Sequence, residues 1–489
     1  MSDEERRARL TASISGLADR EPVVSARRIL TTPQRNGFIG LGVVTVLGCI
    51  ISWVVTLQVY VTVLTFLYVA AIIYRLNLFH RSSMPDTCQV VSDDEARAYP
   101  AELLPVYTVL IPAYREPEVI RHLIDRVTRF EYPPDRLDVK LLIEEDDQAT
   151  IDAVMAARPG DQFELVLIPA AEPRTKPKAL NYGLTLARGE FVAVYDAEDE
   201  PEPLQLRRAV VALRRLGPDV GCLQAKLSYH NPMQNLITKW FTIEYALWFS
   251  FFLPGLASMD APIPLGGTSN HFRRMALQSM GAWDPFNVTE DADLGIRMFR
   301  EGYTVGVLES TTLEEANSDF VNWMKQRSRW LKGYIQTFLV HLRHPLELRR
   351  EMGLKNVGHF CMFVGGTPIL AIINPIFWLM TIVWFVAHPT FIELIFPAPI
   401  YYLGLASFVF GNFLLVYVTV MSCRMVHRGT LLWAALLVPI YWVMMSMAAI
   451  KAVWQLAGAP NFWEKTVHGL HSSPKATGAA PPGTGPAPR

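Results

Sequence analysis

The fold of the central part of the chain is decided by YTVLIP (107–112), VKLLIEE (139–145), ELVLIP (164–169) and FVAVYD (191–196). Helical patterns lie between and after these apolar segments, for example the amphipathic stretch 202–216. Short apolar strands that alternate with helices indicate a mostly parallel sheet with crossover helices. We therefore predict an α/β domain over residues 105–345.

Acidic residues gather at the carboxyl ends of these segments, where open parallel sheets bind their ligands. Acids that meet at one sheet edge repel one another unless a cation neutralises them. Asp196 and Glu198, two residues apart at the end of FVAVYD, are suited to hold Mg²⁺ or Mn²⁺ through oxygen ligands. A solvated acidic loop is the alternative. The polar residues at these ends are Tyr114, Arg115, Glu116, Glu144, Glu145, Asp146, Asp147, Asp196, Glu198 and Asp199.

Two further motifs each allow a functional and a structural interpretation. Lys176 in TKPKALN leads into a helix and could bind phosphate, or it is an ordinary surface lysine. Thr289, Glu290 and Asp291 precede an amphipathic helix. They could form a helix cap with acids in the first turn, or supply a general base. The local sequence does not separate these readings.

The segment QRSRW places Gln326, Arg329 and Trp330 at i, i+3 and i+4, on one side of a helix. An indole stacks on the apolar face of a sugar, and an arginine grips a phosphate with its planar fork. The alternative is an amphipathic helix whose tryptophan lies at the membrane interface.

Composition indicates a membrane protein. Of 489 residues, 51% are hydrophobic and 19% are charged, and the mean hydropathy is +0.20; a soluble domain carries about 25% charge. The 45 Lys and Arg residues balance 46 Asp and Glu residues, giving a net charge of −1. This balance leaves no general electrostatic reason to bind nucleic acid.

Long uncharged runs predict where the chain meets the bilayer. The run Phe38 to Tyr74 is too long for one crossing and predicts a hairpin that turns near Thr56–Gln58. Arginines before, between and after the runs place these loops in the cytoplasm. The run from Gly429 could cross the membrane or lie along its inner surface. The later uncharged runs are 360–387, 394–423 and 429–450.

Together and in order, the motifs resemble those of the membrane-integrated family-2 glycosyltransferases, typified by bacterial cellulose and hyaluronan synthases. The resemblance covers residues 38–470. IPAYRE (111–116) is similar to the family's opening motif, IEEDD (143–147) to its uridine-binding motif and DAED (196–199) to its D-x-D motif. TKPKALN is similar to its lysine loop, Thr289–Asp291 to its T-E-D motif and Gln326–Trp330 to its Q-x-x-R-W motif. Glu198 departs from the usual second Asp.

The resemblance implies a cytosolic nucleotide-sugar-binding (GT-A, Rossmann-like) domain, a UDP-sugar donor, Mg²⁺ or Mn²⁺, and inversion at the anomeric carbon. It further implies that Asp291, beside Glu290, is the base and that Arg329 stabilises the leaving diphosphate. Trp330 and Gln326 would contact the acceptor, with His271 as either a further polar contact or a structural residue. The implied donor contacts are Tyr114, Glu116 and Glu145 for the nucleoside, Lys176 for the diphosphate, and Asp196 and Glu198 for ribose, phosphate and metal.

The tail segment FWEKT resembles the gating loop of cellulose synthase, with Phe462, Lys465 and Thr466 as its characteristic residues. A gating loop requires a cytoplasmic tail, so we favour an interfacial segment from Gly429 and four crossings. The predicted order is a cytosolic N-terminal tail (1–37), a transmembrane helical hairpin (38–74), a linker (75–104), the GT-A domain with interfacial helices (105–345), two transmembrane helices (346–423), an interfacial or transmembrane helix (424–457), the gating-loop-like segment (458–471) and a disordered tail (472–489).

The predicted activity is processive: a sugar passes from a nucleotide donor to a growing β-linked polysaccharide at the cytoplasmic membrane, with the catalytic domain facing the cytoplasm. Single addition to a lipid acceptor is the alternative, because the membrane helices are few. A non-catalytic membrane receptor or channel with a degenerate transferase domain is a third interpretation. Membrane lipids are expected partners in each case, and export proteins or a homo-oligomer could complete a channel.

Overall fold

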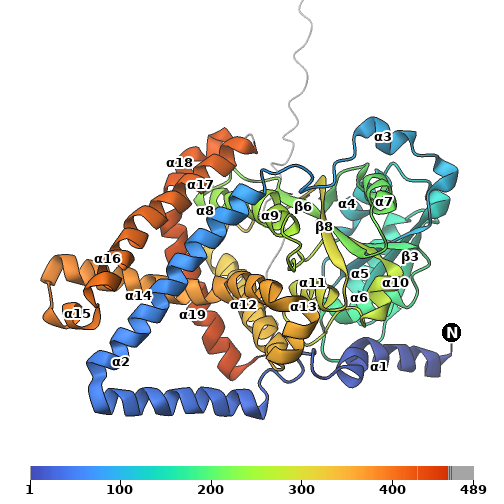
Figure 1. Ribbon diagram of the computed structural model, residues 1–489. Coiled ribbons are helices and arrows are strands. Elements are labelled where there is room, and N and C mark those ends of the chain that lie inside the picture. Colours follow the sequence, from blue (N-terminus) through green and yellow to red (C-terminus); the bar gives the residue numbers. More distant parts are fainter. Residues whose placement is uncertain (1, 427, 461, 463, 465–489) are drawn as a thin grey trace, which may run out of the picture.

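The computed structural model describes residues 2–426, 428–460, 462 and 464 (Figure 1). An eight-stranded mixed sheet in the order β3-β2-β1-β4-β7-β6-β8-β5 forms the centre of the globular part. Its strands are β1 (Tyr107–Ala113), β2 (Leu137–Glu144), β3 (Phe163–Ile168), β4 (Phe191–Val194), β5 (Glu200–Pro201), β6 (Val220–Tyr229), β7 (Asn270–Arg273) and β8 (Thr304–Glu314).

The four strands predicted from the apolar segments are confirmed and pair in parallel, β3-β2-β1-β4. The other half of the sheet differs from the parallel expectation. Strand β7 runs antiparallel to both β4 and β6, and β5 runs antiparallel to β8. Only β6 and β8 pair in parallel there. The reason is the short strand β7, which brings the GGTSNHF segment into the sheet beside the end of β4.

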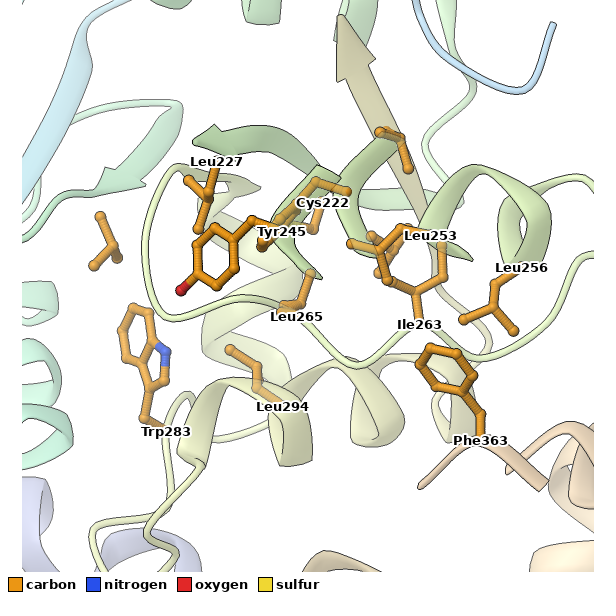
Figure 2. Close-up of a cluster of buried hydrophobic side chains, with 14 of the residues drawn as sticks. Cys222, Leu227, Tyr245, Leu253, Leu256, Ile263, Leu265, Trp283, Leu294 and Phe363 are labelled. Atoms are coloured by element: carbon orange, nitrogen blue, oxygen red, sulfur yellow. The ribbon is translucent and has the colours of Figure 1, made fainter. Parts of the chain in front are cut away.

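Successive side chains of each strand point to opposite faces of the sheet, and both faces are buried. Val109 and Ile111 of β1 face one core, and Leu110 between them faces the other. The first core is covered by α4 (Ile120–Thr128), α5 (Gln148–Ala157) and α7 (Gln205–Arg215). The second core, part of which is drawn in Figure 2, lies under α6 (Lys176–Leu184), α8 (Leu236–Leu247), η3 (Trp248–Phe252), α9 (Leu253–Ala257) and α11 (Glu290–Arg300).

Helix α12 (Phe320–His341) follows β8 and carries the QRSRW segment. Helix α19 (Val438–Gly458) packs along it, although the two are about a hundred residues apart in sequence. The remaining short elements of the globular part are α3 (Asp93–Ala98), η1 (Ala101–Leu103), η2 (Pro134–Arg136) and α10 (Arg274–Ser279).

The N-terminal tail is helical and lies against the sheet domain. Helix α1 (Asp3–Arg20) begins with a capping box formed by Ser2 and Glu5. It packs against α6, where the Asn181 side chain donates to the Ser13 carbonyl (3.1 Å). The segment after α1 is fixed by Arg343, whose guanidinium donates to several of its carbonyls.

Four helical stretches in the described part of the chain are long and apolar enough to cross a membrane. Their large apolar side chains are widely exposed; Ile51 and Val386 keep 85% and 80% of their surface. They indicate association with a membrane. The stretches are Thr32–Arg81, Pro345–Ala387, Ala398–Met425 and Val438–Gly458.

These stretches comprise more than one element each, except for the first and the last. Thr32–Arg81 is α2. The others contain or adjoin α13 (Pro345–Phe360), η4 (Cys361–Gly365), α14 (Gly366–Ala387), α15 (Thr390–Ile395), α16 (Ala398–Ala406), η5 (Ser407–Gly411), α17 (Asn412–Met425), η6 (Gly429–Leu431) and α18 (Leu432–Leu436).

The bend in α2 lies at Ser52, not at the predicted Thr56–Gln58. Ser52 has extended backbone angles, and its hydroxyl accepts from the Val55 amide (3.4 Å), which caps the second half of the helix. The two halves meet beside the bend, where the hydroxyls of Thr45 and Tyr60 form a hydrogen bond. Apolar length predicted a turn, but the serine cap sets its position.

Candidate active site

The end of β4 brings a lysine and an acid together. Lys176, the first residue of α6, forms an ion pair with Asp196 and donates to the Gly267 carbonyl (2.7 Å). Asp196 interacts electrostatically with Lys176, as does Glu290, and together they raise the pKa of the ammonium group although burial opposes this. The predicted partners Lys176 and Asp196 therefore share one site, and the lysine is not an ordinary surface residue.

The turn after β4 is fixed by Asp199, an acid to which the sequence assigned no separate role. Asp199 is buried, and its carboxylate accepts from the Asp196 amide (2.8 Å) and from the Thr268 hydroxyl. These bonds leave Asp196 and Glu198 partly exposed at the turn. A spacing of three residues between an acid and a strand-end amide is the signal that could have identified Asp199 as the anchor of this turn.

A second cluster forms beside it from the first and second strands. Arg174 donates to the Tyr114 hydroxyl (2.9 Å) and to Asp146 (2.6 Å), and its guanidinium lies 6.0 Å from the centre of the Tyr114 ring. Because Arg174 and Lys176 are two residues apart, this cluster adjoins the Lys176–Asp196 pair. Sequence reasoning included Tyr114 but assigned no role to Arg174.

The other two acids predicted to face the nucleoside have different partners. Glu145 is exposed, forms an ion pair with Arg6 of α1 (3.1 Å) and accepts from the Ala170 amide (3.3 Å). The Glu116 amide donates to the Thr150 hydroxyl (3.2 Å), which fixes the loop that carries Tyr114. Asp146, rather than Glu145, therefore belongs to the Tyr114–Arg174 cluster.

The Thr289-Glu290-Asp291 segment begins α11 and faces the same site. A methyl group added at Gly267 would lie 3.1 Å from the Asp291 Oδ2 atom and 3.9 Å from the Lys176 Nζ atom. The Thr289 side chain does not cap the helix. It packs instead against Gly333 of α12, where an added methyl group would lie 2.2 Å from its Oγ1 atom. Glycine at 333 thus permits the close approach of α11 and α12.

The two acids of this segment titrate unusually. Burial, together with the charge of Asp291, raises the pKa of Glu290 to about 8. Burial also raises the pKa of Asp291, although the Ala292 amide, Lys176 and Arg329 oppose this. At neutral pH Glu290 is therefore largely protonated and places little negative charge beside Asp291.

The residues of QRSRW divide between two surroundings. Arg329 interacts electrostatically with Glu290, Asp291 and Asp196. The Trp330 ring stacks on Tyr245 of α8, with centroids 6.3 Å apart and an interplanar angle of 25°. Gln326 accepts from the Asn317 side chain (2.8 Å), so it fixes the loop before α12. Trp330 remains partly exposed and lies at the boundary between the charged site and the aromatic cluster.

Of the two interpretations of His271, the structure favours the structural one over contact with the acceptor. This residue lies in β7 and is fully buried, and its Nδ1 atom is 2.8 Å from the Tyr107 hydroxyl. Burial lowers its pKa to about 3. A histidine in the middle of a sheet strand packs between the strands' aromatic residues and does not reach a cleft.

The gating-loop-like segment returns to α12. The Phe462 carbonyl accepts from the Lys332 ammonium (2.6 Å), and the Pro460 carbonyl accepts from Gln336 (2.9 Å). The side chain of Phe462 is exposed. Lys465 and Thr466, the other two residues predicted for this loop, lie outside the described residues.

Comparison with known sequences identifies the domain that holds this site. Residues 105–333 match the profile of the family described as "Glycosyltransferase like family 2". This region is a glycosyltransferase-like domain of family 2. This match contains every strand of the sheet and the site residues from Tyr114 to Trp330, and it confirms the predicted enzyme class.

Curated relatives are similar over the same region. The probable glycosyltransferase YdaM of Bacillus subtilis (strain 168) is 27% identical over 262 residues, which are 53% of this chain and 62% of that protein. A beta-monoglucosyldiacylglycerol synthase of Nostoc sp. is 28% identical over 268 residues, 53% of this chain and 55% of that protein. The probable glucomannan 4-beta-mannosyltransferase 1 of Arabidopsis thaliana is 28% identical over 242 residues (48% and 44%). The chain thus spans about half the length of these relatives.

A solved structure confirms the GT-A fold of the glycosyltransferase domain. The mannosyltransferase PcManGT from Pyrobaculum calidifontis, in complex with GDP-Man and Mn²⁺, superposes with a TM-score of 0.50 at 18% sequence identity. The superposition covers 83% of this chain and 99% of that one.

The acids at the end of β4 are compatible with a divalent cation. Asp196 and Glu198 are partly exposed on one turn. No three His, Cys, Asp or Glu side chains of the described residues converge as a complete cation site. Mg²⁺ prefers about six oxygen ligands and usually takes several from water and substrate phosphates. Two carboxylates therefore suit a cation that obtains its other ligands from a bound diphosphate.

Proposed function

We propose that this protein transfers a sugar, with inversion, from a UDP-sugar to a growing β-linked polysaccharide at the inner face of the cytoplasmic membrane. The observation that carries the proposal is the convergence of Lys176, Asp196 and Asp291 around Gly267, with Arg329 in electrostatic range. A lysine, an acid suited to bind a metal ion and a partly buried base at one sheet edge are the groups that sugar transfer from a diphosphate requires.

The donor occupies the β4 side of this site. Tyr114, Arg174 and Asp146 form a polar and aromatic surface for the nucleoside, and Lys176 and Arg329 bind the diphosphate. Asp196 and Glu198 would hold Mg²⁺ or Mn²⁺, which would supply positive charge to offset that of the departing nucleotide. Lys176 exchanges its ion pair with Asp196 for a phosphate oxygen when the donor binds.

Asp291 acts on the acceptor side. Its carboxylate takes the proton of the acceptor hydroxyl, whose oxygen forms a bond with the anomeric carbon as the bond from that carbon to the diphosphate breaks. Attack opposite the leaving group inverts the anomeric centre. Glu290, protonated at neutral pH, places no second negative charge next to the attacking oxygen.

Trp330 holds the acceptor sugar through a sequence of additions. Its ring is partly exposed and braced by Tyr245, so it presents a fixed apolar surface on which each new chain end can stack.

A single addition to a lipid is the second candidate. The aromatic cluster around Trp330 continues toward the membrane helices through the contact of Trp248 with Phe363 (4.9 Å), and the relatives include a beta-monoglucosyldiacylglycerol synthase.

Contacts between the domain and the membrane segments support four crossings. The N-terminal segment contacts the domain, as do Leu78 at the end of α2 and Arg428 after α17. The chain therefore returns to the domain after α2 and again after α14 to α17, so each of these units crosses as a pair. Because the domain is on one side of the bilayer, arginine-rich loops place that side in the cytoplasm.

Helix α19 is the interfacial segment of this topology. Tyr441 near its start bonds Glu244 of α8 (2.5 Å), and Phe462 beyond its end bonds Lys332 of α12. The contacts of both ends with the domain support an interfacial position over a single crossing. Its exposed residues, such as Trp454 at 82% exposure, would lie in the inner leaflet.

A donor and product screen tests the proposal. The full chain in nanodiscs is incubated with radiolabelled UDP- and GDP-sugars and Mg²⁺ or Mn²⁺, with dioleoylglycerol or cellotetraose as acceptor. We expect one UDP-sugar to give a ladder or polymer that a β-glycosidase digests. A single labelled glycolipid would replace processive synthesis with lipid glycosylation, and the absence of nucleotide diphosphate release from every donor would overturn both.

A further inference from the structure

Arg327, the second residue of QRSRW, has no role in the mechanism described above, yet it lies against the acceptor tryptophan. It is 4% exposed. Its guanidinium lies 4.4 Å from the centre of the Trp330 ring and 4.2 Å from that of Phe241. The cation is therefore held between two aromatic faces, an attractive arrangement that fixes the direction of both rings.

A carboxylate on α8 fixes the guanidinium in turn. The Arg327 Nη1 atom donates to Glu244 Oε1 (3.0 Å), and its Nη2 atom lies 2.5 Å from Glu244 Oε2. The Tyr441 hydroxyl of α19 donates to the same Oε2 atom (2.5 Å), and the Trp323 indole donates to the Tyr441 oxygen (3.3 Å). One chain of contacts thus joins α19, α8 and α12 to the ring of Trp330.

Stability alone does not account for this arrangement. A buried ion pair adds little stability in comparison with apolar side chains of the same volume. Only arginine can present two donors in a plane to a carboxylate while its face stacks on a ring; lysine carries one flexible charged group. The residue type and its geometry therefore serve orientation.

We propose that Arg327 is a positioning residue for Trp330, and that Glu244 and Tyr441 hold Arg327 in place. The placement of α19 against the domain thereby sets how well the acceptor stacks. This inference rests on the proposed function, in which Trp330 binds the acceptor sugar. It makes acceptor binding, and not donor binding, sensitive to a residue on the interfacial helix.

The test compares Arg327→Lys and Tyr441→Phe with Arg214→Lys in full-length protein in nanodiscs. Arg214 is the matched control, because it also pairs with a glutamate through two nitrogens (Glu190, 2.7 Å each) and lies over a ring (Phe191, 5.4 Å), but on α7. Transfer to cellotetraose and to dioleoylglycerol is measured beside nucleotide diphosphate release without acceptor. Thermal unfolding reports folding.

We expect Arg327→Lys to raise the acceptor KM about tenfold, because lysine cannot hold the Trp330 ring as the guanidinium does. Tyr441→Phe should raise it about threefold, because Glu244 then loses one of the groups that fix it. Donor KM and nucleotide release should stay within about twofold for both, and Arg214→Lys should change neither. An unchanged acceptor KM in folded Arg327→Lys, or equal losses of release and transfer, would overturn the inference. If Arg327→Lys does not fold, the acceptor KM of Tyr441→Phe decides in the same way.

Trp330→Ala separates this inference from the proposal on which it rests. If Trp330→Ala raises the acceptor KM and Arg327→Lys does not, only the positioning role fails. If neither changes it, Trp330 does not bind the acceptor and the proposed function fails with it. In the variant that combines Trp330→Ala with Arg327→Lys, the two increases in acceptor KM should not add, because both act on the same stacking surface.

Discussion

The proposed donor side and the proposed acceptor side of the site consist of different kinds of side chain. The donor side consists of charged groups in direct contact, such as the Lys176–Asp196 pair, held at the end of one strand by the buried Asp199. The acceptor side consists of rings with one guanidinium among them, contributed by α8, α12 and α19. Charged groups suit a departing diphosphate, and aromatic rings suit a sugar. Substitutions on the two sides should therefore change different kinetic parameters.

The largest effect should come from the group that lies between the two sides. Asp291→Asn removes the base and should lower kcat about 10³- to 10⁴-fold, with little change in folding, because general bases contribute effects of this size. Steady-state transfer of labelled sugar measures it. Glu290→Gln should lose much less, since Glu290 is largely protonated at neutral pH. Equal losses in the two variants would contradict the assignment of Asp291.

Metal removal should affect the donor side almost as strongly. Chelation with EDTA should lower nucleotide release more than about 10²-fold, because charge on the leaving diphosphate is then uncompensated. Added Mg²⁺ or Mn²⁺ should restore the wild type. Asp196→Asn and Glu198→Gln should need a higher metal concentration. If EDTA has no effect on release, these acids do not hold an essential metal ion.

Substitutions on the acceptor side should change the acceptor KM. Trp330→Ala should raise the acceptor KM roughly 10- to 100-fold, the equivalent of one lost sugar–aromatic stack of about 1–3 kcal/mol. Trp330→Phe should recover part of the loss because it keeps a ring. Titration of cellotetraose at saturating donor measures both. A raised donor KM would show that the two sides are not separate.

The pH profile should show the raised pKa of Asp291. Burial raises this pKa, so the carboxylate is ionised only at a higher pH than an ordinary aspartate. Below that pKa, kcat/KM should rise about tenfold per pH unit, and the rising limb should lie above the ordinary value near 4. A rising limb centred at or below the ordinary aspartate value would contradict a base with a raised pKa.

The smallest effect on catalysis should come from His271, which belongs to neither side. His271→Leu removes the partner of the Tyr107 hydroxyl and should cost about 1–3 kcal/mol of unfolding free energy. The pKa of about 3 in the folded protein is lower than the ordinary value. His271 therefore stabilises the wild type above pH 6.5, and this contribution is lost as the pH falls toward 3. Thermal unfolding measures this loss, and the acceptor KM should stay unchanged.

The meeting of the charged residues could be expected from the sequence more readily than the contacts of the aromatic cluster, for a physical reason. Strands β1 to β4 are short, mostly apolar segments that pair in parallel, and their carboxyl ends share an edge, so acids after them were expected to meet. Position 199 was harder, because an anchoring acid and a ligand acid look alike in sequence. Nothing local in QRSRW shows that Arg327 pairs with Glu244, 83 residues away.

In the sheet and in the membrane helices, too, some features could not be predicted from the local sequence. The antiparallel strand β7 has only four residues, Asn270–Arg273, so no apolar run announces it, and the sequence left both interpretations of His271 open. The hairpin in α2 followed from length, but its bend follows from the cap at Ser52. The contact of α1 with α6 depends on residues far apart in sequence, which periodicity does not reveal.

The most direct test is the ratio of sugar incorporated to nucleotide diphosphate released, measured in one reaction for the wild type, Trp330→Ala and Asp291→Asn. We expect a ratio near one for the wild type and a much lower ratio for Trp330→Ala, in which released sugar passes to water. Asp291→Asn should lose both signals together. A ratio that Trp330→Ala leaves unchanged, or release that survives in Asp291→Asn, would contradict a site with a charged donor side and an aromatic acceptor side.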